Sequence, residues 1–229
     1  MIPKLVWQTH EAAADDLETF QKNIGNTWNF LNPTWTHKYV DAEQRALDIQ
    51  EYDQELYPIY LRLSKTSQAD LWRYVKLYQE GGVYADMDSV CVKPLDDLVD
   101  AVYNGEDMIC TPIGLGTDEG DGLVNNSNFA AIKNSKILKD VIDSIKAQYR
   151  ILNAETPGDE LFANQSICWG EFCDIVIKNQ DLVSFTFDCE SHSSELKIKF
   201  SDYEVQYSGI ICQYLDLAKL QKWDVYTDI

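Results

Sequence analysis

The sequence predicts a single α/β domain in which a mostly parallel central sheet is flanked by helices. Short apolar runs of strand length alternate along the chain with longer segments of helical periodicity, the pattern of layered α/β proteins. The chain has 229 residues, enough for one sizeable core. Its sequence contains no internal repeat, low-complexity tract or long linker. We therefore expect one continuous domain.

In the first part of the chain, apolar runs bounded by turn residues mark the elements. A turn is expected at Asn32-Pro33, because both residue types favour turns. Strands are expected at residues 4–8 and 34–40, and helices at residues 12–23 and 41–49.

The strongest helical signal covers residues 67–80, where apolar residues recur at helical spacing. Ser67 is the expected N-terminal cap, with Asp70 as its capping-box partner. Gly81-Gly82 should end the helix, because glycine tolerates the left-handed conformation found at helix C-termini.

A short apolar strand at residues 83–85 follows the glycines and leads into Asp86-Met87-Asp88. Residues 89–92 are expected to continue as extended chain. In open α/β sheets, ligands bind beyond the carboxyl ends of the strands. The two aspartates therefore stand where a site is expected.

The later part of the chain carries weaker signals. Strands are expected at residues 108–112, 181–188 and 197–200, an acidic glycine-rich loop at residues 117–122, and a helix at residues 136–149.

The charge of the chain limits its partners. The formal net charge is -19, the wrong sign for binding a nucleic-acid backbone or an anionic membrane surface. A small anionic ligand is still compatible with this charge, because a divalent cation can reverse the local field at its site.

Several features favour a cytoplasmic protein. No secretory signal peptide is visible at the N-terminus, and no apolar stretch reaches the roughly 18 residues that a membrane span requires. The six cysteines show no metal-binding spacing, so we expect reduced, buried thiols.

Asp86-Met87-Asp88 is the only strict Asp-x-Asp in the sequence. In an extended segment, residues two apart project to the same side, so the two carboxylates could converge on one cation. Mg²⁺ and Mn²⁺ prefer oxygen ligands and often keep substrate phosphates in their shell. The pair would suit a diphosphate leaving group whose charge a metal neutralises. Alone the motif is also a common surface pattern in acidic proteins, but here it follows an apolar strand.

The segment around this pair carries a specific resemblance. Residues 65–89, KTSQADLWRYVKLYQEGGVYADMDS, resemble the DXD-containing sugar-binding region of a glycosyltransferase family that includes yeast-type α-mannosyltransferases and many bacterial and viral glycan enzymes. The opening IPKLVWQTH is similar to the first strand of that family, although Trp7 and His10 stand where the family usually has His and Trp. Residues 26–40 resemble the segment that follows.

The resemblance implies a GT-A type fold, with a Rossmann-like nucleotide-binding sheet in residues 1–100 and an acceptor-binding, metal-completing half in residues 101–229. It also implies a metal-dependent transfer of a hexose-type sugar from a nucleotide-sugar donor to a glycan or glycoprotein acceptor. A UDP-sugar is the favoured donor and GDP-mannose the second, with Mn²⁺ or Mg²⁺ as cofactor.

Metal ligands follow from the same resemblance. Asp88 should ligate the metal directly, and Asp86 should bind the donor ribose or a metal-bound water. His192 is the implied third ligand, with Asp188 or Glu190 as substitutes. A solvated loop histidine is the alternative for His192.

The remaining donor-binding residues that the resemblance implies are Gln8, Thr9, Asp70, Arg73, Asn126 and Asn128. Asp70 and Arg73, three residues apart on one helix, should reach the donor sugar or its phosphates, although a helix-surface ion pair is the alternative. Gln8 and Thr9 should lie near the nucleobase, unless they form an ordinary strand end. The two asparagines should face the reacting sugar, unless they form a turn.

Two other functions are compatible with parts of the pattern. Residues 86–90 also match the loop of haloacid-dehalogenase-type phosphatases, in which the first aspartate is a nucleophile. A non-catalytic sugar- or nucleotide-binding module would keep the same side chains without turnover. The sequence identifies no catalytic base or nucleophile.

Overall fold

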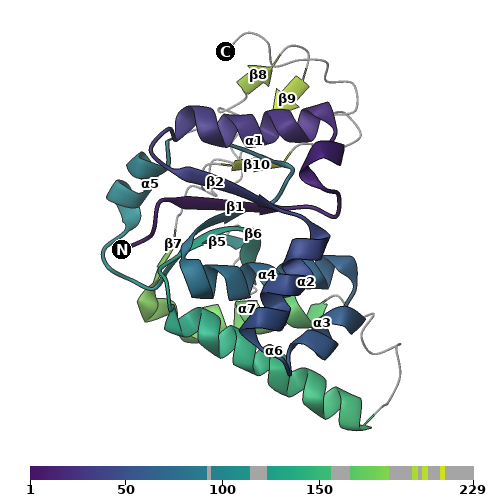
Figure 1. Cartoon of the computed structure of the whole chain (residues 1–229). Coiled ribbons are helices and arrows are strands. Elements are labelled where there is room, and N and C mark those ends of the chain that lie inside the picture. Colours follow the sequence, from purple (N-terminus) through teal and green to yellow (C-terminus); the bar gives the residue numbers. More distant parts are fainter. Residues whose placement is uncertain are drawn as a thin grey trace.

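The computed structural model describes residues 1–91, 94–113, 123–155, 166–185, 198–200, 203–205 and 212–214. Its centre is a six-stranded sheet of order β2-β1-β3-β6-β5-β7 (Figure 1). The strands are β1 Leu5–Thr9, β2 Thr36–Val40, β3 Gly82–Ala85, β5 Met108–Ile113, β6 Leu123–Ala131 and β7 Val183–Phe185. Both neighbours of β6 run antiparallel to it, whereas the other strand pairs of this sheet are parallel. The prediction of a mostly parallel sheet is confirmed, with β6 as the reversed strand.

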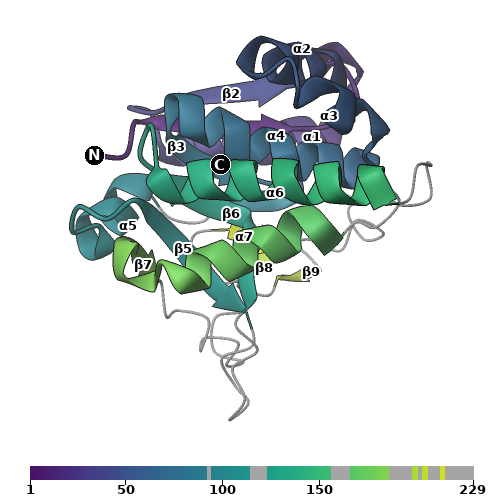
Figure 2. The same cartoon turned by 90° about the horizontal axis from the view of Figure 1, so that it is seen from below.

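Helices cover both faces of the sheet (Figures 1 and 2). One face carries α1 Thr19–Leu31 and α5 Leu95–Val102. The other carries α2 Ala42–Tyr52, α3 Tyr57–Arg62, α4 Lys65–Glu80, α6 Lys136–Glu155 and α7 Ser166–Lys178. Shorter elements are the 3-10 helices Ala14–Asp16 and Gln180–Leu182, the pair β4 Ser89–Cys91 with β10 Cys212–Tyr214, and the pair β8 Ile198–Phe200 with β9 Tyr203–Val205. Within the described parts, none of the helices is long and apolar enough to cross a bilayer.

Two separate cores result from the alternation of side chains along the strands. Val6 and Ala85 pack under α1 and α5, whereas Trp7 and Tyr84 pack against the larger helical layer. Because both faces are covered, the inner strand β3, with the sequence GVYA, is buried along its whole length.

Helix α4 begins earlier than the sequence suggested. Ser64, not Ser67, is the N-cap, and its Oγ accepts the backbone N–H of Ser67 at 3.2 Å. The predicted end of α4 is confirmed. Gly81 has φ 68°, and a Cβ there would lie 2.7 Å from both Lys133 N and Pro3 Cδ. Only glycine fits this position without displacing backbone.

Other boundaries also differ from the predictions. The helix expected at residues 12–23 is α1, shifted toward the C-terminus, because Glu18 caps it in a capping box with Gln21. Helices α3, α5 and α7 were not predicted. The loop at residues 117–122 and the later half of the strand expected at 181–188 lie outside the described residues. Cys168 and Cys173 are buried free thiols, as expected.

Candidate active site

The candidate site lies at the carboxyl edge of the sheet, where β1 and β3 end side by side. β1 lies between two neighbours in the sheet: β2, the next strand along the chain, pairs with one side of β1, and β3 pairs with the other side. The helix after β1 and the helices after β2 cover opposite faces (Figure 1). Such a reversal marks the strand ends at which α/β proteins bind ligands. Thr9 ends β1 and Asp86 directly follows β3, so both lie at these strand ends.

A hydrogen-bonded turn carries the aspartate pair. Asp86 N donates to the Ser127 main-chain oxygen at 2.9 Å, and Ser89 N donates to the Asp86 oxygen at 3.0 Å. The prediction that residues 86–88 are extended was therefore wrong, because the chain turns between Asp86 and Ser89. The extended chain predicted from Ser89 is confirmed as β4, which pairs with β10. The turn still keeps the two carboxylates close, since the charge of Asp86 contributes to the raised pKa of Asp88.

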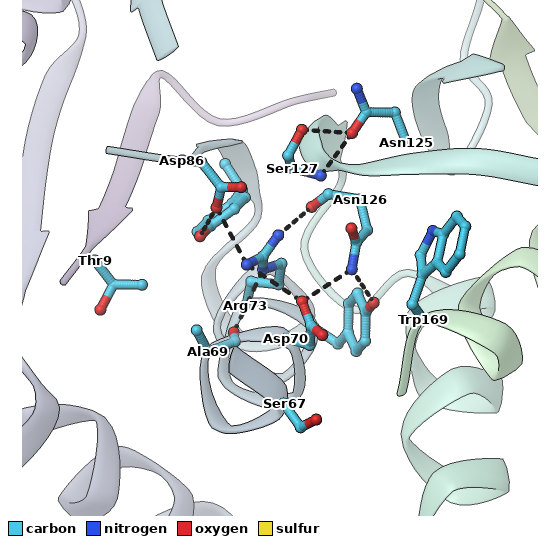
Figure 3. Close-up of polar contacts among 12 residues, drawn as sticks. Thr9, Ser67, Ala69, Asp70, Arg73, Asp86, Asn125, Asn126, Ser127 and Trp169 are labelled. Carbon is cyan, nitrogen blue, oxygen red and sulfur yellow. Dashed lines mark hydrogen bonds and ion pairs between the residues drawn. The ribbon is translucent and has the colours of Figure 1, made fainter. Parts of the chain in front are cut away.

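Arg73 lies at the centre of the site (Figure 3). Its Nη2 lies 3.1 Å from Asp86 Oδ1 and 3.3 Å from Asp70 Oδ1, and its Nη1 donates to the Asn126 main-chain oxygen at 2.6 Å. The Arg73 guanidinium carbon lies 4.2 Å from the centre of the Tyr84 ring. Only 5% of the Arg73 side chain and 8% of the Asp70 side chain are exposed. The pair on α4 is thus part of a buried network, not an ion pair on the helix surface.

Tyr84 connects the strand to this network, because its hydroxyl donates to Asp86 Oδ1 at 2.6 Å. The role of Tyr84 was not predicted, although its spacing from Asp86 could have indicated it. Residues two apart on a strand share a face, so an aromatic residue two positions before Asp86 points to the same side. This two-residue spacing could have identified Tyr84 as a residue that orients the Asp86 carboxylate.

An irregularity in β6 aims a further polar side chain at α4. The register between β5 and β6 shifts between Ile109 and Thr111. Val124 and Phe129, five residues apart, pack in the same core, which regular alternation would forbid. The interruption between them lets Asn126 point toward α4, as bulges near active sites often do. The alternative of a turn at residues 125–128 was wrong, because these residues belong to β6.

Asn126 joins the strand to α4 through its side-chain amide. Its Nδ2 donates to Asp70 Oδ1 at 3.0 Å (Figure 3). The same Nδ2 lies 2.8 Å from the Tyr74 hydroxyl. Burial is the main cause that raises the pKa of the Asp70 carboxyl, and the Asn126 contact opposes it. Nearby, Trp169 Nε1 donates to the Val124 main-chain oxygen at 2.8 Å and holds α7 against β6.

Asp88 is the least satisfied group of the site. Its Oδ1 is buried and has no hydrogen-bond partner among the described residues. Burial, and then the charge of Asp86, raise the pKa of Asp88 to about 6. Asp70, Asp86 and Asp88 contribute three negative charges against the single positive charge of Arg73. A buried, uncompensated carboxylate oxygen in such a cluster fits a divalent cation, which prefers oxygen ligands.

The protein ligands of such a cation are incomplete in the described segments. In these segments, no three His, Cys, Asp or Glu side chains converge in a way that would hold a metal ion. His192, Asp188 and Glu190 lie outside the described residues, so the implied third ligand stays a prediction.

The two residues predicted near the nucleobase have mainly internal partners. Gln8 is fully buried, and its Nε2 donates to the Asp86 main-chain oxygen at 3.0 Å. The Thr9 hydroxyl donates to the Val40 oxygen at 2.6 Å and accepts from Arg45 Nη1 at 2.9 Å. Contact of these two side chains with a nucleobase stays a prediction.

Asn128 is also nearly buried, at 4% exposure. Its Nδ2 donates to Ser127 Oγ at 3.2 Å, and its buried Oδ1 has no partner in the described part of the chain. Its predicted contact with the reacting sugar stays a prediction.

Comparison with known proteins relates part of this chain to a glycosyltransferase family. Residues 18–104 match the family model described as a glycosyltransferase sugar-binding region containing a DXD motif. This part of the chain is therefore similar to DXD-type glycosyltransferase sugar-binding regions. It includes Asp70, Arg73 and both aspartates of the turn, whereas Asn126 lies outside it.

Relatives in sequence are the initiation-specific alpha-1,6-mannosyltransferases of two yeasts. The Saccharomyces cerevisiae protein is 34% identical over 107 residues, which cover 42% of this chain and 21% of that protein. The Candida albicans protein is 35% identical over 104 residues, which cover 42% of this chain and 27% of that protein. The chain thus spans about a quarter of the length of the curated relatives it matches.

Solved structures extend the likeness beyond the sugar-binding region. The UDP-bound glycosyltransferase domain from the YGT toxin aligns with a TM-score of 0.59 at 10% identity, covering 80% of this chain and 79% of that chain. PaToxG glycosyltransferase aligns with a TM-score of 0.57 at 13% identity, covering 78% and 70%. At these identities the likeness establishes the fold, and the GT-A expectation is confirmed.

Proposed function

We propose that this chain is a metal-dependent glycosyltransferase that moves a hexose-type sugar from a nucleotide-sugar donor to a glycan or glycoprotein acceptor. One observation carries the proposal. Asp88 presents a buried carboxylate oxygen without a partner in the described structure, close to Asp86 and to the edge where β1 and β3 end. This feature lies within the matched sugar-binding region.

In this proposal Asp88 is the direct ligand of Mn²⁺ or Mg²⁺. When bound, the cation supplies positive charge against the diphosphate that leaves with the nucleotide. The protein contributes orientation before any ligand arrives. Asp86 Oδ1 already accepts from Tyr84 and Arg73, so further contacts of this carboxylate with a ribose or a metal-bound water fall to Oδ2.

Asp70 and Arg73 form the floor of the proposed donor-sugar site. Arg73 is nearly saturated by internal acceptors, so its main task is to hold two carboxylates at fixed positions. Carboxylates held in this way can stabilise positive charge that develops on the sugar during transfer, without having to reorganise. Asp70, fixed by Arg73 and Asn126, is placed to accept a hydrogen bond from a sugar hydroxyl.

A UDP-sugar is the first donor to test and GDP-mannose the second. The YGT toxin domain, which shares the fold, has UDP bound. The yeast relatives, which share the sugar-binding region, are mannosyltransferases by name. Both donors share the diphosphate that the Asp86–Asp88 turn would meet.

Slow hydrolysis of the donor tests the proposal without knowledge of the acceptor. The protein is incubated with several UDP-hexoses or with GDP-mannose, with Mn²⁺ or with EDTA, and the released nucleotide is quantified by chromatography. We expect release from one donor class, dependent on metal and lost in Asp88→Asn. Asp140→Asn, a matched substitution at an exposed pair on α6, should behave as wild type.

The same assay, repeated with a phosphomonoester as substrate, separates the two competing functions. A binding module without turnover would bind a nucleotide with metal and release nothing. A phosphatase of the haloacid-dehalogenase type would instead free phosphate from a phosphomonoester. The position of Asp86 after β3, not after the first strand, weighs against the phosphatase.

A further inference from the structure

We propose that Gln8 and His37 are positioning residues, which together fix the Asp86–Ser89 turn in the geometry that binds the metal. The inference rests on the proposed function and adds to it two side chains that touch neither metal nor donor. It also reassigns Gln8, which the sequence suggested as a nucleobase contact.

Gln8 acts on the backbone of the turn. Its Nε2 donates to the Asp86 main-chain oxygen at 3.0 Å, and the same oxygen accepts Ser89 N at 3.0 Å. This carbonyl therefore has two donors, one from β1 and one that closes the turn. Because the carbonyl lies between the two aspartate side chains in sequence, moving it would move both carboxylates relative to each other.

His37 sets the orientation of the Gln8 amide. His37 Nε2 lies 2.8 Å from Gln8 Oε1 and Nδ1 lies 3.5 Å from Asn29 Nδ2. An amide oxygen can only accept, so the proton must be on Nε2. Burial lowers the pKa of His37 to about 4, which keeps the ring neutral with a single proton near pH 7. With Oε1 engaged by His37, the Gln8 NH₂ group must face Asp86.

Gly25 in the middle of α1 provides the space that this arrangement needs. A Cβ at Gly25 would lie 3.2 Å from His37 Cε1 and 3.8 Å from Gln8 Oε1. Glycine within a helix is unfavourable on its own, so its presence needs a packing reason. Here the reason is the close approach of the imidazole. The series of contacts therefore leads from Gly25 in α1 to His37 in β2, then to Gln8 in β1, and ends at the Asp86 carbonyl of the turn.

Loss of the His37 donor has a specific consequence. Without it, Gln8 can rotate its amide and present Oε1 to the Asp86 carbonyl, where two oxygens repel. The turn then loses one of its two donors, and the apparent Mn²⁺ affinity should fall by about fivefold to tenfold, the size expected for one hydrogen bond.

Mn²⁺ titration at saturating nucleotide, followed by electron paramagnetic resonance, tests this role. His37→Leu should weaken Mn²⁺ binding by about fivefold to tenfold. His37→Gln, whose amide nitrogen can occupy the place of Nε2, should stay within about twofold of wild type. Melting temperatures of the two variants should agree, so that a difference in metal affinity cannot come from unfolding. Equal affinities in the two variants would overturn the inference.

Two further readouts separate this inference from the proposed function. If wild type binds Mn²⁺ with nucleotide but His37→Leu binds it equally well, the proposed function stands and the positioning role fails. If wild type binds no metal–nucleotide pair, both fail. Long-range ¹H–¹⁵N correlation spectra of the ligand-free protein should show His37 as the Nε2–H tautomer, assigned by its loss in His37→Gln. A Nδ1–H tautomer would overturn the relay independently of any ligand.

Discussion

Replacing Asp88 by Asn should make the metal-free protein more stable at pH 7.5. In the folded chain this carboxylate is buried beside Asp86, and its Oδ1 has no partner within the described residues. In the unfolded chain it is solvated. Asparagine has nearly the same shape and no charge, so the substitution removes the unfavourable ionisation of a buried group.

The expected magnitude follows from the pKa of Asp88, which is about 6 in the folded state against an ordinary value of 3.8. Because the folded pKa is the higher one, the folded state binds the proton more tightly. The associated stability is complete below pH 3.8 and is lost as the pH rises through about 6. At about 1.4 kcal/mol for each pH unit, the loss at pH 7.5 is at most about 3 kcal/mol. Partial exposure and the new amide N–H groups reduce this gain, so we expect about 1–2 kcal/mol.

Urea unfolding with EDTA measures the effect in wild type, Asp88→Asn and the control Asp140→Asn. At pH 7.5, Asp88→Asn should unfold at higher urea than wild type, and the difference should shrink toward zero as the pH is lowered to about 4. The control, at an exposed pair with Lys136, should change stability by less than about 0.5 kcal/mol. An Asp88→Asn protein that is no more stable than wild type at pH 7.5 would show that the buried Asp88 carboxylate does not destabilise the fold.

Four other substitutions test the Arg73 network and the helices around it. Arg73→Met should lower the unfolding free energy by about 3–5 kcal/mol, because it leaves two carboxylates without their buried cation; a loss below about 1 kcal/mol in urea would contradict the burial argument. Tyr84→Phe removes the hydrogen bond to Asp86 and should cost about 1.5–3 kcal/mol in the same assay, whereas unchanged stability would show that the bond contributes nothing. Gly81→Ala should destabilise by more than about 1 kcal/mol in thermal unfolding, because of its positive φ and the close backbone. Gly170→Ala in α7, where a Cβ meets nothing within 4 Å, should instead stabilise by up to about 1 kcal/mol, and similar effects at the two glycines would contradict this contrast.

Much of the site could be predicted because its parts are local in sequence. Asp70 and Arg73 share a helix face by their spacing, and the two glycines after that helix lead directly into the strand before Asp86. These relations depend on helix and strand periodicity, which the sequence shows without tertiary information.

The features that escaped prediction depend on contacts between distant segments. The turn at Asp86–Ser89 forms because β4 pairs with β10, more than a hundred residues later. Asn126 reaches α4 because β6 is irregular where it pairs with its two neighbouring strands. The sequence of β6 alone does not indicate this irregularity. Helix α7 was missed because apolar residues occur all round it and obscure the periodicity. The shift of α1 is different, since the Glu18–Gln21 capping box was present in the sequence and was overlooked.

Calorimetric titration of UDP and of GDP into the protein, each with Mn²⁺ and with EDTA, tests whether Asp88 and its turn form the metal and donor site. We expect one of the two nucleotides to bind only with Mn²⁺, and we expect Asp88→Asn to abolish this binding although it leaves the metal-free fold at least as stable. Binding of neither nucleotide in the presence of Mn²⁺, or equal binding with Mn²⁺ and with EDTA, would contradict the assignment of Asp88 and its turn as the metal and donor site.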